Sequence, residues 1–452
     1  MNINIASPLC LISASLLMAA CSEEEVVHIS DSGSNHILFH ASLPALTSRA
    51  QIVTADNLPY FLVTAFNPAD PLLVTPDGRM NEYINKESVT NDAGQDLLTS
   101  EKCLWPVPGK EGNISFFAFY PDLNDGAKLV NATTLNGTEL AIDYKLTDFR
   151  VDPDIAGQQD FITAYASGSK EKNLASGITL NFEHKLSRIQ LQAWGPNKSC
   201  DIEIAGVRIG GVGVEGTFAF MPVQGGGQWS GDIGKGIVEY IYRKGDKIVS
   251  LDRNSGSALS AATAVSIMGS NVGGDDNCAM LLPATYAGWD FLGDGKNDKN
   301  QLYLSVLLRA VDATPTAGKG QQQYPSPQNI GGSDALAIPR VYFAVDKATG
   351  KTVSTRLYKN NNNYFTDEAF TSAYTLTDDE EVKEFGWAAL PVTGEWAPGY
   401  VYTYTLDYTS GIGLHDPESP DAGKPIISDK VDVSVSVKSW QSNSSGIVVP
   451  GL

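Results

Sequence analysis

Histidine and cysteine are scarce in this chain of 452 residues, with five of each. The sequence also has no Gly-x-Ser-x-Gly elbow, phosphate-binding loop or Cys-x-x-Cys pair. Because catalysis needs such groups brought together with shifted protonation, we predict a protein that is not an enzyme and has no cofactor. The 52 acidic residues allow too many pairings to single out one. A glycoside hydrolase with two carboxylates roughly 5–9.5 Å apart in a cleft therefore stays an alternative.

Basic residues are also few, with 32 Lys and Arg against 52 Asp and Glu and a formal net charge of −20. No charged residue precedes Cys21, so this charge belongs entirely to the chain from Cys21 onward. Such a surface repels nucleic acid, and no basic patch with interleaved aromatic residues is present. The sequence therefore excludes nucleic acid as a partner.

The sequence has no apolar run long enough for a transmembrane helix at its start, since Pro8 to Ala20 falls short of the roughly 20 residues required. The run fits a secretory signal. Leu17, Met18, Ala19 and Ala20 lead directly into Cys21, an order that resembles the lipobox of bacterial lipoproteins. The resemblance implies a signal peptide over 1–20 and acylation of Cys21, although no Lys or Arg precedes it; an ordinary secretory signal is the alternative.

Three glutamates, Glu23 to Glu25, follow this cysteine. The cluster resembles the signal that sends Bacteroidetes lipoproteins to the outer face of the outer membrane, and the alternative is a solvated spacer. Of the other cysteines, Cys10 falls in the signal, which leaves Cys103, Cys200 and Cys278. An odd number of remaining cysteines argues against a disulfide framework. We expect these three to be buried small apolar residues.

Long helical patterns are few, whereas Gly, Ser, Thr, Asn and Asp are abundant and typical of an all-β chain with many turns. Alternating or β-branched segments predict strands at 36–43, 60–66, 114–121, 160–166, 178–182, 187–194, 201–209, 216–223, 278–286, 301–311, 340–345, 400–408 and 431–440. One helix is predicted from the capping pattern of Thr377 and Glu380, with Gly386 as its stop. The polar segment 167–177 is the predicted linker, so the fold class is two β-sandwiches in series.

The remaining polar clusters favour structural roles. His36 and His40 on a strand lie about 13 Å apart, too far to share one metal ion. His184 is expected to hydrogen-bond a turn. The loop 289–300 contains Asp290, Asp294 and Asp298 but lacks the order of an EF-hand, which favours an Asx-rich turn over calcium binding. No metal site is predicted.

The order of several weak motifs resembles the fimbrillin-like proteins of Bacteroidetes from Cys21 to about Trp440. The motifs are the alternating strand 36–43, Ser-Arg-Ala at 48–50, "FLVTAF" at 61–66, "FFAFYP" at 116–121 and "FEHKLSRI" at 182–189, followed by a Tyr-rich strand and a valine alternation closing on Trp440. The resemblance implies two transthyretin-like β-sandwich domains, here 50–172 and 173–452. It also implies a subunit of a type V pilus that supports cell adhesion.

The resemblance further implies a maturation step. An Arg-specific protease would cut after Arg49, leave Ala50 as the new N-terminus and remove the propeptide 21–49 with the first strand. The alternative is that Arg49 is a solvated loop residue. Loss of the strand would leave an apolar groove and exposed sheet edges that another subunit's strand can fill.

The C-terminal segment 441–452 is the candidate donor. Ile447, Val449 and Leu452 are its pocket-filling residues, whereas Pro450 counts against a long paired strand. The alternative is that the segment packs back onto its own domain.

We therefore predict a pilin-like lipoprotein at the cell outer membrane that moves to the fimbrium after processing. Its partners are other pilin subunits and a ligand on a host or bacterial surface, and the longer second domain favours a minor or tip subunit. The alternative is a lipid-anchored glycan-binding protein of an uptake system, which would present exposed aromatics; Trp229 and Trp289 are its candidates.

Overall fold

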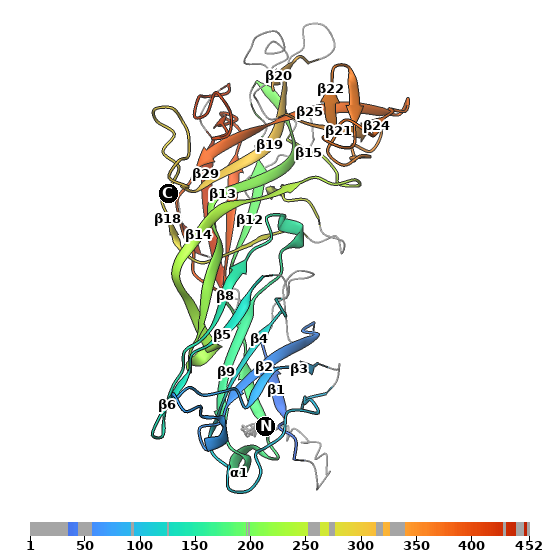
Figure 1. The fold of residues 1–452 in the computed structure, drawn as a ribbon. Helices are drawn as coiled ribbons and strands as arrows, with labels where there is room; N and C mark the ends of the chain where they lie inside the picture. Colours follow the sequence, from blue (N-terminus) through green and yellow to red (C-terminus); the bar gives the residue numbers. More distant parts are fainter. Residues whose placement is uncertain are drawn as a thin grey trace, which may run out of the picture. The chain divides into compact units, whose positions relative to one another are not determined.

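The computed structural model describes residues 35–43, 57–91, 95–123, 126–195, 197, 199–251, 263–270, 276–312, 320–325, 340–427, 431–439 and 447–449. The residues from His36 to Leu452 form one compact unit. Figure 1 shows that the described part of this unit is built almost wholly from strands. The predicted all-β fold class is confirmed. The predicted division at residues 172 and 173 stays a prediction.

A five-stranded antiparallel sheet forms the lower part of this unit in Figure 1. Its order is β11 (Glu183–His184), β9 (Ile162–Gly168), β4 (Ile114–Tyr120), β2 (Tyr60–Phe66) and β3 (Ile84–Thr90). Side chains on alternate strand positions point to opposite faces, and both faces are buried here. Phe61 and Val63 enter one apolar cluster, whereas Leu62 and Phe66 enter another.

The first of these clusters is closed by two short strands, β1 (Phe39–Ser42) and β10 (Ile178–Asn181), which pair in parallel with Phe39 opposite Ile178. Ile178 and Leu180 from β10 and Ile37 and Phe39 from the first strand segment are all buried in it. This pair of strands is therefore the outer layer over one face of the five-stranded sheet.

The largest sheet has ten strands. Its main path runs through β21 (Arg340–Asp346), β25 (Glu380–Pro391), β19 (Tyr303–Asp312), β13 (Cys200–Phe220), β8 (Tyr144–Arg150) and β5 (Lys128–Asn131). Off this path lie β14 (Gly227–Ile241), β15 (Val249–Leu251), β20 (Gln322–Tyr324) and β28 (Leu414–His415).

The strand β13 joins two regions of this sheet. Residues 200–210 pair with β19, whereas residues 215–220 pair with β8. The sequence predicted separate strands at 201–209 and 216–223, whereas the structure has one strand, β13, from Cys200 to Phe220. Their glycine-rich junction stays in the sheet because β14 pairs along it with bulges at Gly210 and Gly213.

A six-stranded sheet packs against the ten-stranded one. It contains β16 (Val265–Ser266), β12 (Ser187–Trp194), β27 (Tyr400–Asp407), β29 (Asp432–Ser439) and β30 (Ile447–Val449), with β17 (Ala279–Leu281) beside β12. Side chains from both sheets share one core, among them Leu191, Tyr404, Ile202 and Val306.

The remaining elements are short. They are β6 (Thr134–Asn136), β7 (Glu139–Ala141), β18 (Thr285–Tyr286), β26 (Gly394–Glu395), β22 (Tyr358–Asn360), β23 (Asn363–Phe365), β24 (Ala373–Tyr374), the 3₁₀ turns η1 (Pro71–Leu73), η2 (Ile155–Gly157) and η3 (Gln224–Gly226), and the helix α1 (Lys170–Asn173). The helix lies inside the predicted linker.

The helix predicted from Thr377 to Gly386 is wrong. Glu380 does accept a hydrogen bond from the Thr377 amide at 3.2 Å, as a capping box requires, but the two residues close a single turn. From Glu380 the chain runs as β25, paired with β21 on one edge and β19 on the other. Pairing of residues 380–386 with β21, and burial that begins at Phe385, outweigh the local capping signal.

Candidate functional site

The first strand segment, residues 36–43, is held on both of its edges. On one edge Leu38 O accepts a hydrogen bond from the amide of Ile178 at 2.8 Å, and Ser42 O accepts one from Phe182 at 2.8 Å. On the other edge the amides of Ile37 and Phe39 each donate at 2.7 Å to residues of the segment 98–104. The segment therefore closes a gap between β10 and segment 98–104.

Its apolar side chains fill the space beneath. Ile37 and Phe39 are 0% exposed and Leu43 is 6% exposed, and all three belong to the cluster under the five-stranded sheet. The Phe39 ring meets Phe61 and Phe116 edge-on, with ring centroids 6.1 and 5.7 Å apart. The burial of these side chains confirms the predicted alternation. Burying each of them stabilises by roughly 1.5–3 kcal/mol, and this gain fixes which face of the strand points inward.

The outward side chains of the segment make polar contacts. His40 Nε2 lies 3.1 Å from the carbonyl oxygen of Ser176, and His36 sits opposite Leu104 in an isolated bridge. Within the ranges that the structure describes, no group of three or more His, Cys, Asp or Glu residues is arranged to hold a metal ion.

Gly177 lies against the backbone of the first strand. Its φ of +71° is one that residues with a Cβ rarely adopt, and a Cβ here would lie 3.0 Å from Leu38 O and 2.9 Å from Leu97 Cδ2. The glycine thus lets the turn before β10 approach the first strand closely.

Segment 98–104 is held by its own polar contacts. Glu87 accepts a hydrogen bond from Ser100 Oγ and pairs with Lys102 Nζ at 3.1 Å. Burial, with the charge of Glu87 as a smaller cause, raises the pKa of the Cys103 thiol to about 12. The thiol therefore stays protonated and is a poor nucleophile. Cys103, Cys200 and Cys278 are all free and buried, as expected.

The C-terminal strand β30 pairs antiparallel with β29, which places Val449 opposite Val435 and Ile447 opposite Val437. Of the segment 441–452, the described residues 447–449 pair with the chain's own sheet. Its transfer to another subunit stays a prediction, and Leu452 lies outside the described residues. Cys21, Arg49 and Ala50, the sites of lipidation and cleavage, lie outside them too.

The two candidate tryptophans are not exposed aromatics. Trp289 is 2% exposed and donates from Nε1 to Gly295 O at 3.1 Å. Trp229 packs edge-on against Phe149, with centroids 4.8 Å apart, and donates to Lys185 O at 2.6 Å. Both rings stabilise the fold.

The other sequence candidates have structural contacts. Asp290 and Asp294 accept hydrogen bonds from the amides of Leu292 and Lys296, which confirms the predicted Asx turns. His184 does not follow the prediction, because its Nδ1 lies 2.7 Å from Asp160 Oδ2 in a buried pair. Buried imidazoles stay in place when a carboxylate fixes them.

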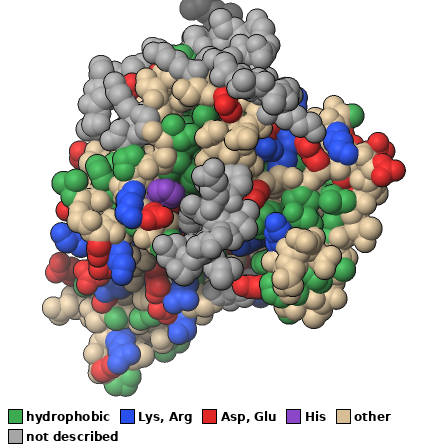
Figure 2. Space-filling view, turned by 90° about the horizontal axis from the view of Figure 1, so that it is seen from above, with side chains coloured by type: hydrophobic (Ala, Val, Ile, Leu, Met, Phe, Trp, Pro, Cys, Tyr) green, Lys and Arg blue, Asp and Glu red, His purple; other side chains and the backbone are tan. Residues whose placement is uncertain are grey.

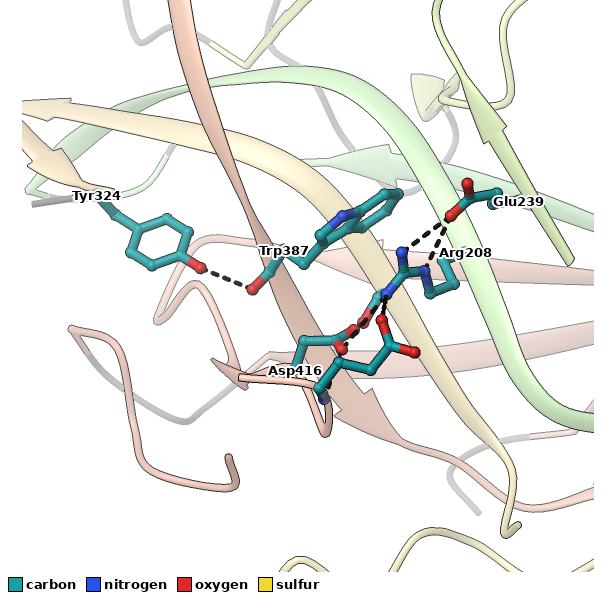
Figure 3. A network of polar contacts seen from close by, with 7 residues as sticks. Arg208, Glu239, Tyr324, Trp387 and Asp416 are labelled. Carbon is teal, nitrogen blue, oxygen red and sulfur yellow. Dashed lines mark hydrogen bonds and ion pairs between the residues drawn. The ribbon is translucent and has the colours of Figure 1, made fainter. Parts of the chain in front are cut away.

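A buried ionic cluster around Arg208 escaped sequence reasoning. Its guanidinium contacts Glu239 at 2.9 Å, Glu418 at 2.7 Å and Asp416 at 3.5 Å, and it lies 4.3 Å from the Trp387 ring centroid. Figure 3 shows the guanidinium between Glu239 and Asp416, beside the Trp387 ring. Asp416 also accepts a hydrogen bond from Ser305. No local spacing signals this cluster, because about two hundred residues separate Arg208 from Asp416.

The electrostatics of the cluster follow from burial. Burial lowers the pKa of Arg208, but the charges of Asp416, Glu239 and Glu418 raise it more, so the net shift is upward. The pKa of Asp416 is also raised, because the effect of burial exceeds the lowering by the charge of Arg208. A pocket of about 520 Å³, lined by Gly211, Tyr303 and Glu418 among others, opens beside the cluster. The cluster attaches residues 416–418 to β13 and β14.

Comparison with known proteins adds the family. Two solved structures are similar to this chain at 11% sequence identity. A fimbrial protein from Bacteroides vulgatus has a TM-score of 0.46, and the match covers 90% of this chain and 100% of that one. A candidate cell adhesion protein from Bacteroides ovatus has a TM-score of 0.36, and the match covers 91% of this chain and 100% of that one. Scores this low carry no argument. No curated protein matches.

The sequence itself matches the model of the fimbrillin-like family over residues 69–305, which is more than half of the chain. The match includes β3, β4, β9 and β10, the strands that form or cover the core beneath the first strand. The resemblance found in the sequence is confirmed, and the chain belongs to the fimbrillin-like family.

Proposed function

We propose that this protein is a pilin subunit that exchanges its first strand for a strand of a neighbouring subunit. The observation that carries the proposal is the first strand segment, which fills an apolar groove and is hydrogen-bonded on both edges. Removal of this segment ends its two-stranded pairing with β10 but breaks no pairing within the five-stranded sheet. Its partners keep other contacts, since Ile178 and Leu180 of β10 are buried in the core and Lys102 of segment 98–104 pairs with Glu87.

Removal of residues 21–49 by a cut after Arg49 would vacate this groove. The rings of Phe61 and Phe116 and the side chain of Ile178 would then face solvent, with unpaired backbone groups on both sides. Apolar surface and open edges are both costly in water. An incoming strand would restore the hydrogen bonds through its main chain and the core through alternate side chains.

The candidate donor is the C-terminal segment 441–452. Its described part, β30, is attached at the end of a sheet through pairing with β29 alone. Release of a three-residue edge strand breaks few hydrogen bonds, whereas insertion into a groove gains pairing on two edges. Ile447, Val449 and Leu452 are the side chains proposed to enter the groove.

The proposal includes delivery to the cell surface. Cys21 would carry the acyl chains that anchor the precursor in the outer membrane, and the protease cut would free the subunit for the fimbrium. Within the described ranges, no helix has the length and apolar character to cross a membrane. The longer second part of the chain, 173–452, supports the proposal of a minor or tip position.

The proposal is tested by the N-terminus and mass of the protein from the cell surface, before and after Arg-specific protease. We expect the treated protein to begin at Ala50 and to form ladders resistant to heating in detergent. Arg49→Lys is the matched control, because it keeps the charge but removes the cleavage site. A wild-type chain that stays monomeric after the cut would overturn strand exchange.

A further inference from the structure

The small sheet β22–β23–β24 projects from the ten-stranded sheet and has no core of its own. None of the residues from Tyr358 to Tyr374 is buried, and in Figure 1 the three strands stand clear of the large sheets at the upper right. The sheet is nevertheless regular, with Lys359 opposite Tyr364 and Asn360 opposite Asn363. An exposed sheet of this kind presents its side chains rather than stabilising a core.

Aromatic side chains occur in each of its three strands and in the turn that follows β23. The rings of Phe365 and Phe370 meet edge-on at 5.5 Å, and Tyr364 contacts Tyr342 at 5.8 Å. Phe370 is 41% exposed. Figure 2, which looks from above, shows apolar side chains reaching the surface on the right, where β22–β24 lie in Figure 1.

Phe370 is held in an unfavourable backbone conformation. Its φ is +56°, in a region that bulky side chains avoid. Asp367 fixes this turn by accepting hydrogen bonds from the amides of Thr371 at 3.0 Å and Ser372 at 2.6 Å. These bonds also lower the pKa of Asp367. A strained position that its surroundings enforce is a feature of binding sites.

Two cations accompany the rings. The Arg356 guanidinium lies 5.0 Å from the Tyr358 ring centroid, and Lys359 Nζ lies 5.7 Å from Tyr342 and 5.8 Å from Tyr364. Neither cation has a carboxylate within ion-pair distance among the described residues, and the buried Arg356 Nε has no hydrogen-bond partner there. Tyr358 lies opposite Phe365, so Arg356 accompanies the face that carries Phe365, whereas Lys359 is opposite Tyr364 on the other face. The guanidinium of Arg356 is therefore the charge that is complementary to an anionic ligand on the Phe365 face.

We propose that β22–β24 binds a carbohydrate that carries a carboxylate. Phe365 and Phe370 offer a surface for the apolar face of a sugar ring, and the Asn residues of the turn, 360–363, offer amide donors and acceptors for hydroxyl groups. Arg356 pairs with the carboxylate, for which its planar guanidinium is suited. This inference goes beyond the assembly mechanism and concerns a different surface.

The test is a calorimetric titration of the uncleaved, monomeric full-length chain with sialyllactose, trigalacturonate and lactose. The first two probes carry a carboxylate from different sugars, whereas lactose lacks one. We expect at least one acidic probe to bind roughly tenfold or more tighter than lactose, since a charge-assisted hydrogen bond contributes about 1.5–3 kcal/mol. Equal binding of all three, or none, would overturn the proposal.

Two variants locate the site. Arg356→Gln is expected to bring acidic probes to the affinity of lactose. Phe370→Asn keeps a residue that tolerates positive φ and is expected to weaken every probe by roughly two- to tenfold, because aromatic contacts contribute about 0.5–1.5 kcal/mol. Lys172→Gln, on the exposed helix α1, is the control for lost charge and should bind as wild type.

Unchanged affinity in Arg356→Gln and Phe370→Asn would overturn this location of the site. Thermal unfolding of each variant separates a lost contact from a lost fold, and Phe370→Asn, at an exposed turn, keeps the test decisive if Arg356→Gln does not fold. A poly-glutamate peptide that binds as tightly as the acidic sugars would overturn the carbohydrate assignment in favour of an acidic protein. Since the titrated chain is uncleaved, failure here is distinct from failure of strand exchange.

Discussion

Truncation of Phe39 to alanine is the most direct perturbation of the first-strand groove. The side chain is 0% exposed and meets two aromatic rings at 5.7 and 6.1 Å. Removing a buried phenylalanine costs about 3–5 kcal/mol, from lost transfer energy and the cavity left behind. We expect Phe39→Ala to lower the free energy of unfolding of the uncleaved protein by that amount, measured by urea denaturation.

Leu38→Ala is the matched control, because Leu38 is adjacent in sequence and only half-buried on the opposite side of the strand. Half-burial of a leucine side chain contributes about 1 kcal/mol. The two variants should therefore differ by more than about 2 kcal/mol. Equal losses in both variants would refute the idea that the first strand supplies the groove's core.

The same substitution tests exchange in trans. A synthetic peptide of residues 36–43 should bind the protein after it is cut at Arg49. The peptide with Phe39→Ala should bind roughly 100- to 4000-fold more weakly, since a loss of about 3–5 kcal/mol is converted at 1.4 kcal/mol per factor of ten. Fluorescence anisotropy of a labelled peptide measures both affinities. Equal affinities would show that the peptide does not occupy the groove.

Three further expectations concern neighbouring groups. Cys103, whose pKa burial raises to about 12, should react slowly with Ellman's reagent in the precursor and faster once the strand leaves; unchanged rates would contradict the opening of the groove. Gly177→Ala should destabilise the protein by about 1–3 kcal/mol, measured by urea denaturation. The loss should exceed that of Gly137→Ala, because Gly137 also has a positive φ, of +64°, but has no atom within 4 Å of an added Cβ. Burial raises the pKa of Asp416 above 3.8, so its protonated form is favoured on folding and its contribution to stability falls as pH rises above about 4. Asp416→Asn should show a shallower fall of stability above about pH 4, measured by urea denaturation at several pH values, and an identical slope would refute this assignment.

Local patterns predicted the strands well where one face is buried. The bounds of β2 and β12 agree with the predicted 60–66 and 187–194, because their composition and their burial favour the same structure. The helix predicted at 377–386 is wrong because a capping box is a local signal, whereas residues 380–386 pair with β21 and the strand continues through residue 391 beside β19. Sequence spacing also cannot reveal contacts such as Arg208 with Asp416, which depend on the completed sheet.

The candidate site shows the same division. The alternation at 36–43 correctly indicated which side chains face inward, but its partner across the gap, segment 98–104, carries no strand pattern and joins through isolated bridges. The small sheet β22–β24 was likewise not predicted, because its strands are only two or three residues long. Strands this short contain too few residues to show the alternation of apolar and polar side chains.

Strand exchange requires that the rest of the subunit stay folded when the first strand leaves. The five-stranded sheet meets this requirement because its two faces belong to separate apolar cores. Its other face packs Phe66 and Phe117 against Tyr144 and Phe220 of the ten-stranded sheet, with ring centroids 5.7 to 6.4 Å apart. Thr64 adds a buried hydrogen bond to Tyr144 at 3.0 Å. None of these contacts involves residues 36–43. Loss of the first strand therefore uncovers one core, while the other core continues to hold the five-stranded sheet, which is the floor of the groove, in place.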